Sequence, residues 1–338
     1  MQRKNFLPII LVTALTCAAT GVAQTPPAVQ PELQRLMNID ATDTATKLAL
    51  MDDMLNKQDI QSNLLLFNSL YSDTVRLEMI QFKSDNTVAI PAYQFTSRKL
   101  DRAAKHPAVL MVHGGFHDHF DTYYFGPIAQ AVEAGYVVLF PEYRGSSGYG
   151  EVHLENSYGT TDVADVLSGA DYLSGLSFVD PGRLGIIGHS RGGMVTLLAI
   201  ERAPKVFKVA VDIAGLADFV AYMSYKPEYR RLEVAKEATF GGKMPNERLQ
   251  PYMDISPVNH VADIQAPLLV LANSFDKTVP YALHSGRLIE LLKAYNKTFE
   301  SHLYKDAAGA HMFPFANTVE GQDVWKRTFA WVGKYLKP

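Results

Sequence analysis

The chain has 338 residues, of which 47% are hydrophobic and 20% are charged, and its formal net charge is −3. Its 35 acidic and 32 basic residues nearly balance, which argues against nucleic acid or an anionic membrane surface as a partner. The length is enough for one large α/β domain, alone or with a modest appendage.

Residues 1–23 have the pattern of a secretory signal peptide. A basic pair precedes an apolar run from Phe6 to Ala19, and the small residues Gly21–Ala23 stand where a signal peptidase would cut. An uncleaved anchor is the alternative, but the run is short for a membrane span and Pro8 interrupts it. We therefore expect a secreted or periplasmic protein without stable membrane insertion. The single cysteine, Cys17, falls in this segment, so a mature chain would have no disulfide and no cysteine nucleophile.

Residues 24–73 are expected to form a leader and a helical prefix. Three prolines between Thr25 and Pro31 indicate an extended leader. From Glu32 to about Leu70, apolar residues recur at helical spacing. We expect these helices to pack on the main domain rather than to form a separate unit.

Residues 74–338 alternate between strand and helix patterns. Strands are expected at 75–79, 88–92, 108–112, 137–140, 184–187, 209–213, 268–272 and 299–304, and helices at 128–133, 160–173, 192–202, 281–295 and 323–336. The first two strands suit an antiparallel pair, and the rest predict a mostly parallel, doubly wound sheet with helices on both faces. In such sheets functional groups gather at the carboxyl ends of the strands.

Residues 216–262 interrupt this alternation with a long connection rich in aromatic side chains. Such a connection is usually a lid or a binding insertion, although a helical excursion that only covers the sheet is the alternative. Within it, Tyr222 and Tyr225 are candidate substrate-binding residues, together with Tyr143 outside it.

The stretch from Leu184 to Thr196 predicts a strand, a sharp turn and a helix, with Ser190 at the turn. Gly188 and Gly192 flank the serine in the pattern G-x-S-x-G, the nucleophile elbow of serine hydrolases. The turn exposes the hydroxyl above the sheet and directs backbone N–H groups toward a developing oxyanion. A glycine-rich turn with an idle serine is the alternative.

A serine nucleophile needs a general base and a carboxylate that orients the base. In this architecture they follow later in the chain, the acid first and the histidine second, each in a loop after a strand. Asp276 follows the strand at 268–272, and His311 follows the strand at 299–304. Asp306 is the fallback acid, whereas His302 lies within a strand. We therefore predict Ser190, Asp276 and His311 as the catalytic triad.

An oxyanion hole is expected from two segments. One donor is the backbone N–H of Arg191, directly after the serine, and the other comes from the loop after the strand at 108–112. In that loop Gly115 is the first candidate and Phe116 the second, while His113 is expected to bond neighbouring backbone.

The sequence His117-Asp118-His119, with Asp121 nearby, could be taken for metal ligands. No further spaced histidine completes a recognisable site, so a polar loop at the mouth of the active site is the preferred interpretation. We predict no metal and no cofactor.

Several longer motifs resemble the catalytic domain of the prolyl oligopeptidase family of serine peptidases, within the α/β-hydrolase superfamily. They are H-G-G at 113–115, Y-R-G-S-S-G-Y-G at 143–150, the approach to the elbow at 179–190, D-K-T-V-P at 276–280 and G-A-H-M-F at 309–313. The resemblance runs from about Val75 to the C-terminus. It implies an α/β-hydrolase fold and acyl hydrolysis, to which the residue patterns above add a short helical prefix and a small lid-like insertion.

Departures from the family pattern leave the cleaved bond open. Family peptidases usually carry an N-terminal β-propeller, whereas the residues before Val75 have helical patterns, and the usual His-Gly before the acid is replaced by Ala272-Asn273. The paired glutamates with which dipeptidyl peptidases hold a substrate's amino terminus are not found. We expect Glu142 and Glu201 at the surface or in supporting positions.

The sequence therefore predicts a serine hydrolase that acts on a small-molecule ester or peptide substrate. A prolyl oligopeptidase-like peptidase and a carboxylesterase are both open. A catalytically idle binding protein on a hydrolase fold is the alternative from another class.

Overall fold

A computed structural model describes residues 44–85, 87–155 and 158–338. The chain divides into two compact units, residues 1–50 and 51–338. The expected signal peptide, its cysteine and the extended leader lie outside the described residues. Most of helix α2 (Thr44–Tyr71) belongs to the second unit. No helix within the described ranges is long and apolar enough to cross a membrane.

An eight-stranded sheet forms the centre of the second unit. Its strands are β1 (Val75–Ser84), β2 (Val88–Ser97), β3 (His106–Val112), β4 (Val137–Pro141), β5 (Val179–His189), β6 (Val209–Ile213), β7 (Leu268–Asn273) and β8 (Phe299–Tyr304). The helices that follow α2 are α3 (Phe125–Glu133), α4 (Glu151–Leu154), α5 (Thr161–Gly175), α6 (Arg191–Arg202), α7 (Phe219–Tyr225), α8 (Glu228–Lys236), α9 (Gln250–Asp254), α10 (Ser285–Ala294) and α11 (Val319–Leu336).

The strand order is β1-β2-β4-β3-β5-β6-β7-β8. β1 pairs with β2 and β2 with β4 in antiparallel fashion, and every later pair is parallel. The predicted mostly parallel sheet is therefore confirmed, and the fold is that of the α/β hydrolases. One predicted helix, at 281–295, is split: residues Tyr281–Leu283 form a 3₁₀ turn before α10 begins.

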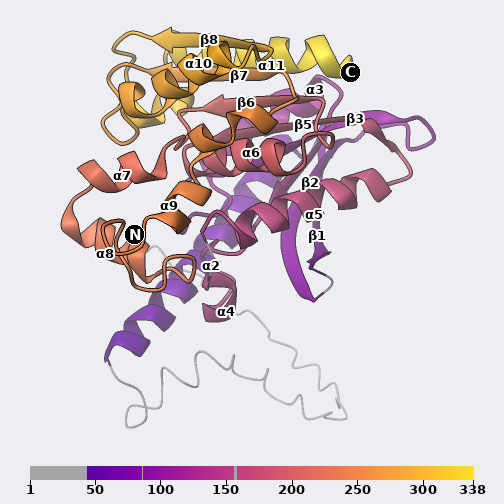
Figure 1. Cartoon of the computed structure of the whole chain (residues 1–338). Coiled ribbons are helices and arrows are strands. Elements are labelled where there is room, and N and C mark those ends of the chain that lie inside the picture. The colour runs from indigo at the N-terminus through magenta and orange to yellow at the C-terminus, as the bar shows by residue number, and fades with distance from the viewer. Residues whose placement is uncertain (1–43, 86, 156–157) are drawn as a thin grey trace, which may run out of the picture. The chain divides into compact units, whose positions relative to one another are not determined.

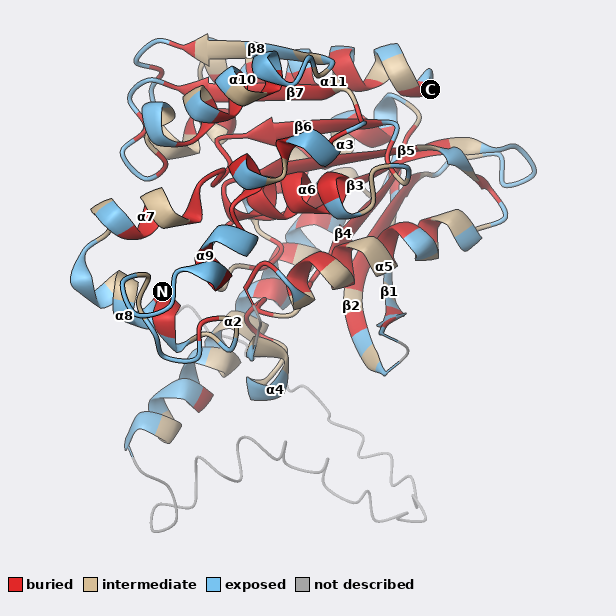
Figure 2. Cartoon of the chain, in the orientation of Figure 1, coloured by how far each residue is buried: buried red, intermediate tan, exposed pale blue. Residues whose placement is uncertain are grey.

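Two apolar clusters cover the two faces of the sheet, because successive side chains of a buried strand point to opposite faces. In β3, Leu110 and Val112 belong to one cluster, while Val109 and Met111 belong to the other. Helices α5, α6 and α10 contribute to the first cluster, and α2, α3 and α11 to the second. Figure 2 shows the central strands almost entirely buried, with exposed residues on the outer sides of the helices.

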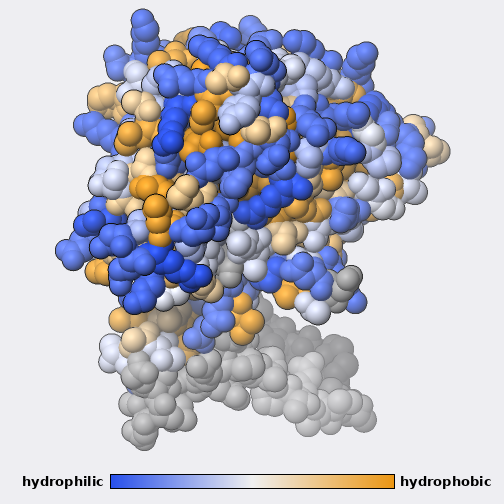
Figure 3. Space-filling model, viewed as in Figure 1, coloured by the Kyte–Doolittle hydropathy of each residue, from blue (hydrophilic) through white to orange (hydrophobic). Residues whose placement is uncertain are grey.

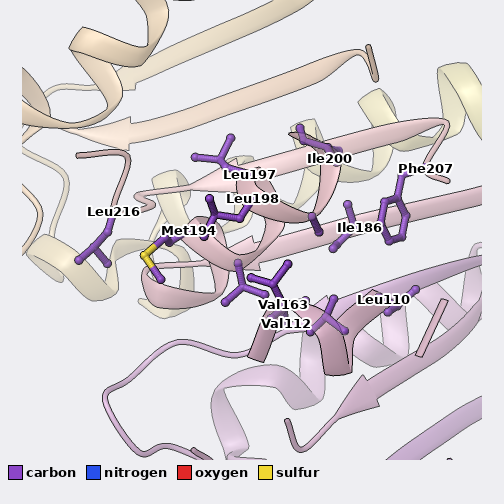
Figure 4. Close-up of a cluster of buried hydrophobic side chains, with 14 of the residues drawn as sticks. Leu110, Val112, Val163, Ile186, Met194, Leu197, Leu198, Ile200, Phe207 and Leu216 are labelled. Carbon is purple, nitrogen blue, oxygen red and sulfur yellow. The ribbon is translucent and has the colours of Figure 1, made fainter. Parts of the chain in front are cut away.

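Helix α6 fixes the turn that precedes it through its packing on the sheet. Figure 4 shows Met194 and Leu198 from this helix beside Ile186 of β5 and Val112 of β3, within one buried cluster. All four side chains are at most 1% exposed. Since burying such a side chain contributes roughly 1.5–3 kcal/mol, the helix start at residue 191 is held firmly against β5.

The segment between β6 and β7 contains the helices α7, α8 and α9. In Figure 1 these helices lie on the side to which the arrowheads of β6 and β8 point, which is the carboxyl end of the parallel strands. The insertion expected at residues 216–262 is thus placed where functional groups gather in such sheets.

Candidate active site

The turn between β5 and α6 holds Ser190 in a backbone conformation that residues other than glycine rarely adopt, with φ 60° and ψ −121°. A Cβ atom at Gly188 would lie 2.0 Å from the carbonyl oxygen of Gly192, and one at Gly192 would lie 2.1 Å from that of Val112. Only glycine fits at these two positions. The Ser190 N–H donates to the Ile213 carbonyl at 2.9 Å, so the strained turn is held by β6 as well as by α6.

Ser190, His311 and Asp276 lie within hydrogen-bond distance in series. His311 Nε2 is 2.8 Å from Ser190 Oγ, and His311 Nδ1 is 2.6 Å from Asp276 Oδ2. An ionised carboxylate can only accept, so Nδ1 carries the proton and Nε2 is left to accept from the serine hydroxyl. These residues follow β5, β8 and β7 respectively, and the sheet brings their loops together at one edge.

Neighbouring groups fix the orientation of the acid and the base. Asp276 Oδ1 accepts the N–H groups of Thr278 and Val279 at 2.8 and 2.9 Å, which leaves Oδ2 for the histidine. His189 Nε2 donates to the carbonyl oxygen of His311 at 3.0 Å. Burial lowers the pKa of His189 to about 3, so this ring stays neutral and keeps its donor role.

The fallback acid and the second histidine lie elsewhere. Asp306 accepts a hydrogen bond from the Ser274 hydroxyl at 3.1 Å instead of meeting His311. His302 lies on β8 and packs edge-on against Tyr304.

Three backbone N–H groups beside Ser190 have no hydrogen-bond acceptor among the described residues: those of Gly115, Phe116 and Arg191. All three residues line the cavity that contains Ser190. The neighbouring Gly114 N–H is already bound to the Tyr124 hydroxyl at 3.1 Å. Gly115 adopts φ +76°, a conformation that glycine reaches without strain. This is the donor set that the sequence predicted, with unused N–H groups on both segments.

The side chain of Arg191 has a role that the sequence did not reveal. Its guanidinium is 2% exposed, donates Nη2 to Asp162 at 3.0 Å and lies 3.9 Å from the centroid of the Tyr158 ring. Nη1 donates to the Phe116 carbonyl oxygen at 2.5 Å. One residue therefore links the start of α6 to the loop after β3. The sequence gave no signal of the contact between Arg191 and Asp162, because Asp162 lies on the separate helix α5.

A cavity of about 250 Å³ opens beside Ser190 and His311. Aromatic side chains, three cationic side chains and one carboxylate form much of its wall. The lining includes Phe116, Tyr123, Tyr124, Tyr158, Leu216, Tyr222 and Val279, with Asp118, Arg191, Lys226 and Arg230 as the charged residues apart from histidine.

Only one of the three tyrosines expected to bind substrate lies in this wall. Tyr222 lines the cavity. Tyr143 does not, because it is fully buried beneath the loop after β3, where its hydroxyl donates to the His113 carbonyl at 2.9 Å. Tyr225 also lies outside the lining, and its hydroxyl donates to the Thr278 carbonyl at 3.0 Å. Tyr143 and Tyr225 therefore support the loops of the site rather than its surface.

The side chains of the loop 117–121 form hydrogen bonds with several neighbouring segments or line the cavity. His117 donates to the Gly145 carbonyl at 2.8 Å, and His119 lies between the Ser147 hydroxyl and the Asp59 carboxylate. Asp118 instead lines the cavity, and burial raises its pKa to about 6. Within the described ranges, no three His, Cys, Asp or Glu side chains converge as metal ligands would.

Glu142 is fully buried, so of the two expected positions it takes the supporting one and not the surface one. Its Oε1 accepts the Phe120 N–H at 2.8 Å, and its Oε2 lies 3.6 Å from His113 Nε2. His113 donates Nδ1–H to the adjacent Gly114 carbonyl at 2.9 Å, as expected. Burial raises the pKa of Glu142 to about 8. Glu201 is also buried, at 5% exposure, without a hydrogen-bond partner in the described structure.

The raised pKa of Glu142 predicts a pH-dependent effect on stability. The folded chain keeps this carboxyl protonated up to about pH 8, whereas the unfolded chain releases the proton near its ordinary value. Glu142 therefore contributes a penalty that grows as the pH rises between these two values. We expect Glu142→Gln to gain stability relative to wild type, by roughly 3–4 kcal/mol, between about pH 5 and about pH 8.

Urea unfolding at both pH values measures this difference. Glu133→Gln, at an exposed glutamate of α3, is the control and should show no pH-dependent gain. A Glu142→Gln curve that stays parallel to wild type across this range would contradict the assignment.

Comparison with known proteins agrees with the fold. The sequence model of the prolyl oligopeptidase family, Peptidase_S9, matches residues 123–338. The acylamino-acid-releasing enzyme of Arabidopsis thaliana is 28% identical over 195 residues, which cover 56% of this chain and 25% of that enzyme. The chain thus spans about a quarter of the length of the first curated relatives that it matches.

Solved structures give the same fold. A puromycin-hydrolyzing peptidase of Mycobacterium tuberculosis superposes with a TM-score of 0.69 at 24% identity, covering 77% of this chain and 39% of that one. An acylaminoacyl peptidase of Pyrococcus horikoshii gives a TM-score of 0.69 at 23% identity, covering 81% and 44%. The fold and the family match together define a serine hydrolase. The chain belongs to the prolyl oligopeptidase family.

Proposed function

We propose that this protein hydrolyses ester or amide bonds through an acyl-enzyme on Ser190, as a prolyl oligopeptidase-like peptidase. The observation that carries the proposal is the hydrogen-bonded series Ser190, His311 and Asp276 at 2.8 and 2.6 Å, next to unused N–H donors in one cavity. An idle binding protein would have no need for a base held at this distance from a strained serine.

The chemistry follows the arrangement of these groups. His311 Nε2 takes the hydroxyl proton as Ser190 Oγ attacks the substrate carbonyl, and Asp276 stabilises the imidazolium that forms. The N–H groups of Arg191 and of Gly115 or Phe116 then bind the oxyanion. The tetrahedral intermediate collapses, and His311 returns the proton to the leaving group. Water next attacks the acyl-enzyme with His311 again as base, which releases the acid and restores the serine.

A matched substrate panel tests both the mechanism and the bond that is cleaved. Short-chain nitrophenyl esters would be compared with aminoacyl and acyl-peptide nitroanilides, using wild type and Ser190→Ala. We expect wild type to cleave both classes and Ser190→Ala to lose at least about 10⁴-fold in kcat on each. A fluorophosphonate probe should label wild type at Ser190.

The outcomes distinguish the three functions that the sequence leaves open. Cleavage of the nitroanilides by wild type, but not by Ser190→Ala, supports peptidase activity. Cleavage of esters without amides would make the protein a carboxylesterase that uses the same residues. Failure of the probe to label folded protein, together with no hydrolysis, would leave an idle binding protein.

We also propose export of the protein, which rests on the signal-peptide pattern of residues 1–23. The N-terminal residue of the protein purified from outside the cytoplasm tests this directly, because cleavage near Ala23 should remove the whole apolar run.

A further inference from the structure

The insertion between β6 and β7 places two cationic side chains in the wall of the Ser190 cavity. Lys226 directly follows α7, and Arg230 lies in the first turn of α8, four residues later. Both line the cavity. Neither was singled out by the sequence, although their spacing and the aromatic residues around them were visible.

Arg230 already has a partner. Its Nη1 lies 2.6 Å from Glu233 Oε2, and its guanidinium lies 4.9 Å from the centroid of the Phe116 ring. The guanidinium is thus held over an aromatic side chain of the cavity with donors left beyond the one that Glu233 uses. Figure 3 shows hydrophilic side chains gathered over α8.

Lys226 is different, because no carboxylate among the described residues forms an ion pair with it. Its Nζ donates to the Thr278 carbonyl oxygen at 2.9 Å and lies 4.7 Å from the centroid of the Tyr222 ring. An ammonium has three donors, so at least one is left. Burial lowers the pKa of Lys226 and the charge of Arg230 lowers it further, while the Asp276 carboxylate has a smaller opposing effect. An anion placed beside Nζ would relieve both effects.

The other charged groups of the cavity do not satisfy Lys226. Arg191 adds positive charge, although Asp162 balances it at 3.0 Å. Asp118 is the one carboxylate in the lining, and the neighbouring charges that act most on its pKa are those of His119, Asp121 and Asp59 rather than the two insertion cations. Lys226, on the insertion side of the cavity, therefore has no ion-pair partner among the described residues, since Glu233 pairs with Arg230 and the Asp276 carboxylate is bound to His311.

We propose that Lys226 and Arg230 select substrates that carry a carboxylate next to the scissile bond. The proposal rests on the proposed hydrolysis at Ser190 and names its substrate class. The carboxylate would take the free donors of Lys226 and reach Arg230, while the aromatic wall contacts the rest of the substrate. Two sources offer this chemistry: an acidic residue on the acyl side, or a carboxylate on the leaving group.

Two pairs of substrates distinguish these sources. For the acyl side, N-acetyl-glutamate and N-acetyl-glutamine benzyl thioesters differ in charge but hardly in shape, and peptidases and esterases both cleave such activated esters. For the leaving group, 4-acetoxybenzoate and 4-acetoxybenzamide form the second pair. We expect kcat/KM to favour the charged member of one pair by about tenfold or more, mainly through KM, because hydrogen bonds to charged groups are stronger than those between neutral groups.

Variants assign the preference to residues. Lys226→Gln should bring the charged-to-neutral ratio of kcat/KM close to one, Arg230→Gln should reduce it, and Lys226→Arg should keep most of it. Lys243→Gln removes a cation from the same insertion whose partner is Glu247 at the surface, and it should leave the ratio unchanged.

A purely structural role of Lys226 has its own control. Tyr225 shares the Thr278 carbonyl with Lys226, at 3.0 Å, so Tyr225→Phe removes one support of the Asp276 loop without a change of charge. Loss of support alone would lower both members of a pair equally and keep the ratio.

The result that overturns the inference is a ratio near one in both pairs for wild type, or an unchanged ratio in Lys226→Gln. If neutral substrates are still hydrolysed and Ser190 is still labelled, the proposed function survives this result. If labelling and all hydrolysis are absent, the proposed function fails first and the selectivity proposal fails with it.

Discussion

Replacing Asp276 with asparagine is expected to lower kcat by about 10⁴-fold while the fold is kept. The asparagine side chain has nearly the same shape, but its amide can present N–H to His311 Nδ1, which now lies 2.6 Å from the carboxylate. The ring would then carry its proton on Nε2, facing Ser190 Oγ, and could no longer accept the hydroxyl proton. Steady-state hydrolysis of a nitrophenyl ester measures the loss.

Asp306→Asn is the matched control for this substitution. Asp306 was the fallback acid, and its carboxylate is bound to Ser274 on the same side of the sheet. This variant should retain kcat within about threefold, as expected for a surface change away from the reacting atoms. If the two variants exchanged these outcomes, Asp306 would be the acid and the assignment of Asp276 would be wrong.

Replacing Gly188 with alanine is expected to destabilise the protein by at least about 3 kcal/mol, or to prevent folding. The new methyl group would lie 2.0 Å from the Gly192 carbonyl oxygen and 2.4 Å from Thr196 Oγ1. Both belong to the first turns of α6, which is packed on the sheet and cannot withdraw. Relief would require α6 to move away from β5, and Ser190 would move with it.

Gly175→Ala provides the comparison, because a Cβ atom there meets nothing within 4 Å at the end of α5. That variant should be neutral or slightly stabilised, since alanine is the better helix former. Urea unfolding gives the free energies, and fluorophosphonate labelling reports whether Ser190 is still presented. A Gly188→Ala protein within about 0.5 kcal/mol of wild type would show that the turn can adapt.

The central strands were predictable because most of them contain a short, continuous apolar run, whereas β1 and β2 were predictable from alternating apolar residues. The buried runs in β3, β4 and β6 leave little choice between strand and helix. The helical prefix was less well defined. Apolar and polar residues are mixed around α2, and Leu65 and Leu70 remain exposed, so its sequence does not reveal which face packs or where a unit begins.

Some polar residues of the site were predictable from the sequence and others were not. Ser190, Asp276 and His311 could be chosen from chain order and strand ends, because the fold fixes which loops meet. Contacts between side chains on separate elements could not be predicted in this way. Glu142 was expected either at the surface or in a supporting position, and only the structure shows it buried against Phe120. Tyr143 was expected in the cavity wall and lies beneath it. The sequence pattern shows which loop follows which strand, but it does not show how deeply the side chains of that loop are buried.

The acid and the base follow the last two strands of the sheet in chain order. Ser190 follows β5, whereas Asp276 and His311 follow β7 and β8. A chain that is still being synthesised therefore carries its serine long before it carries either group that activates it. A serine hydroxyl without a base is a poor nucleophile. Ser190 therefore cannot be activated by these groups before the segment that contains His311 has been synthesised and folded.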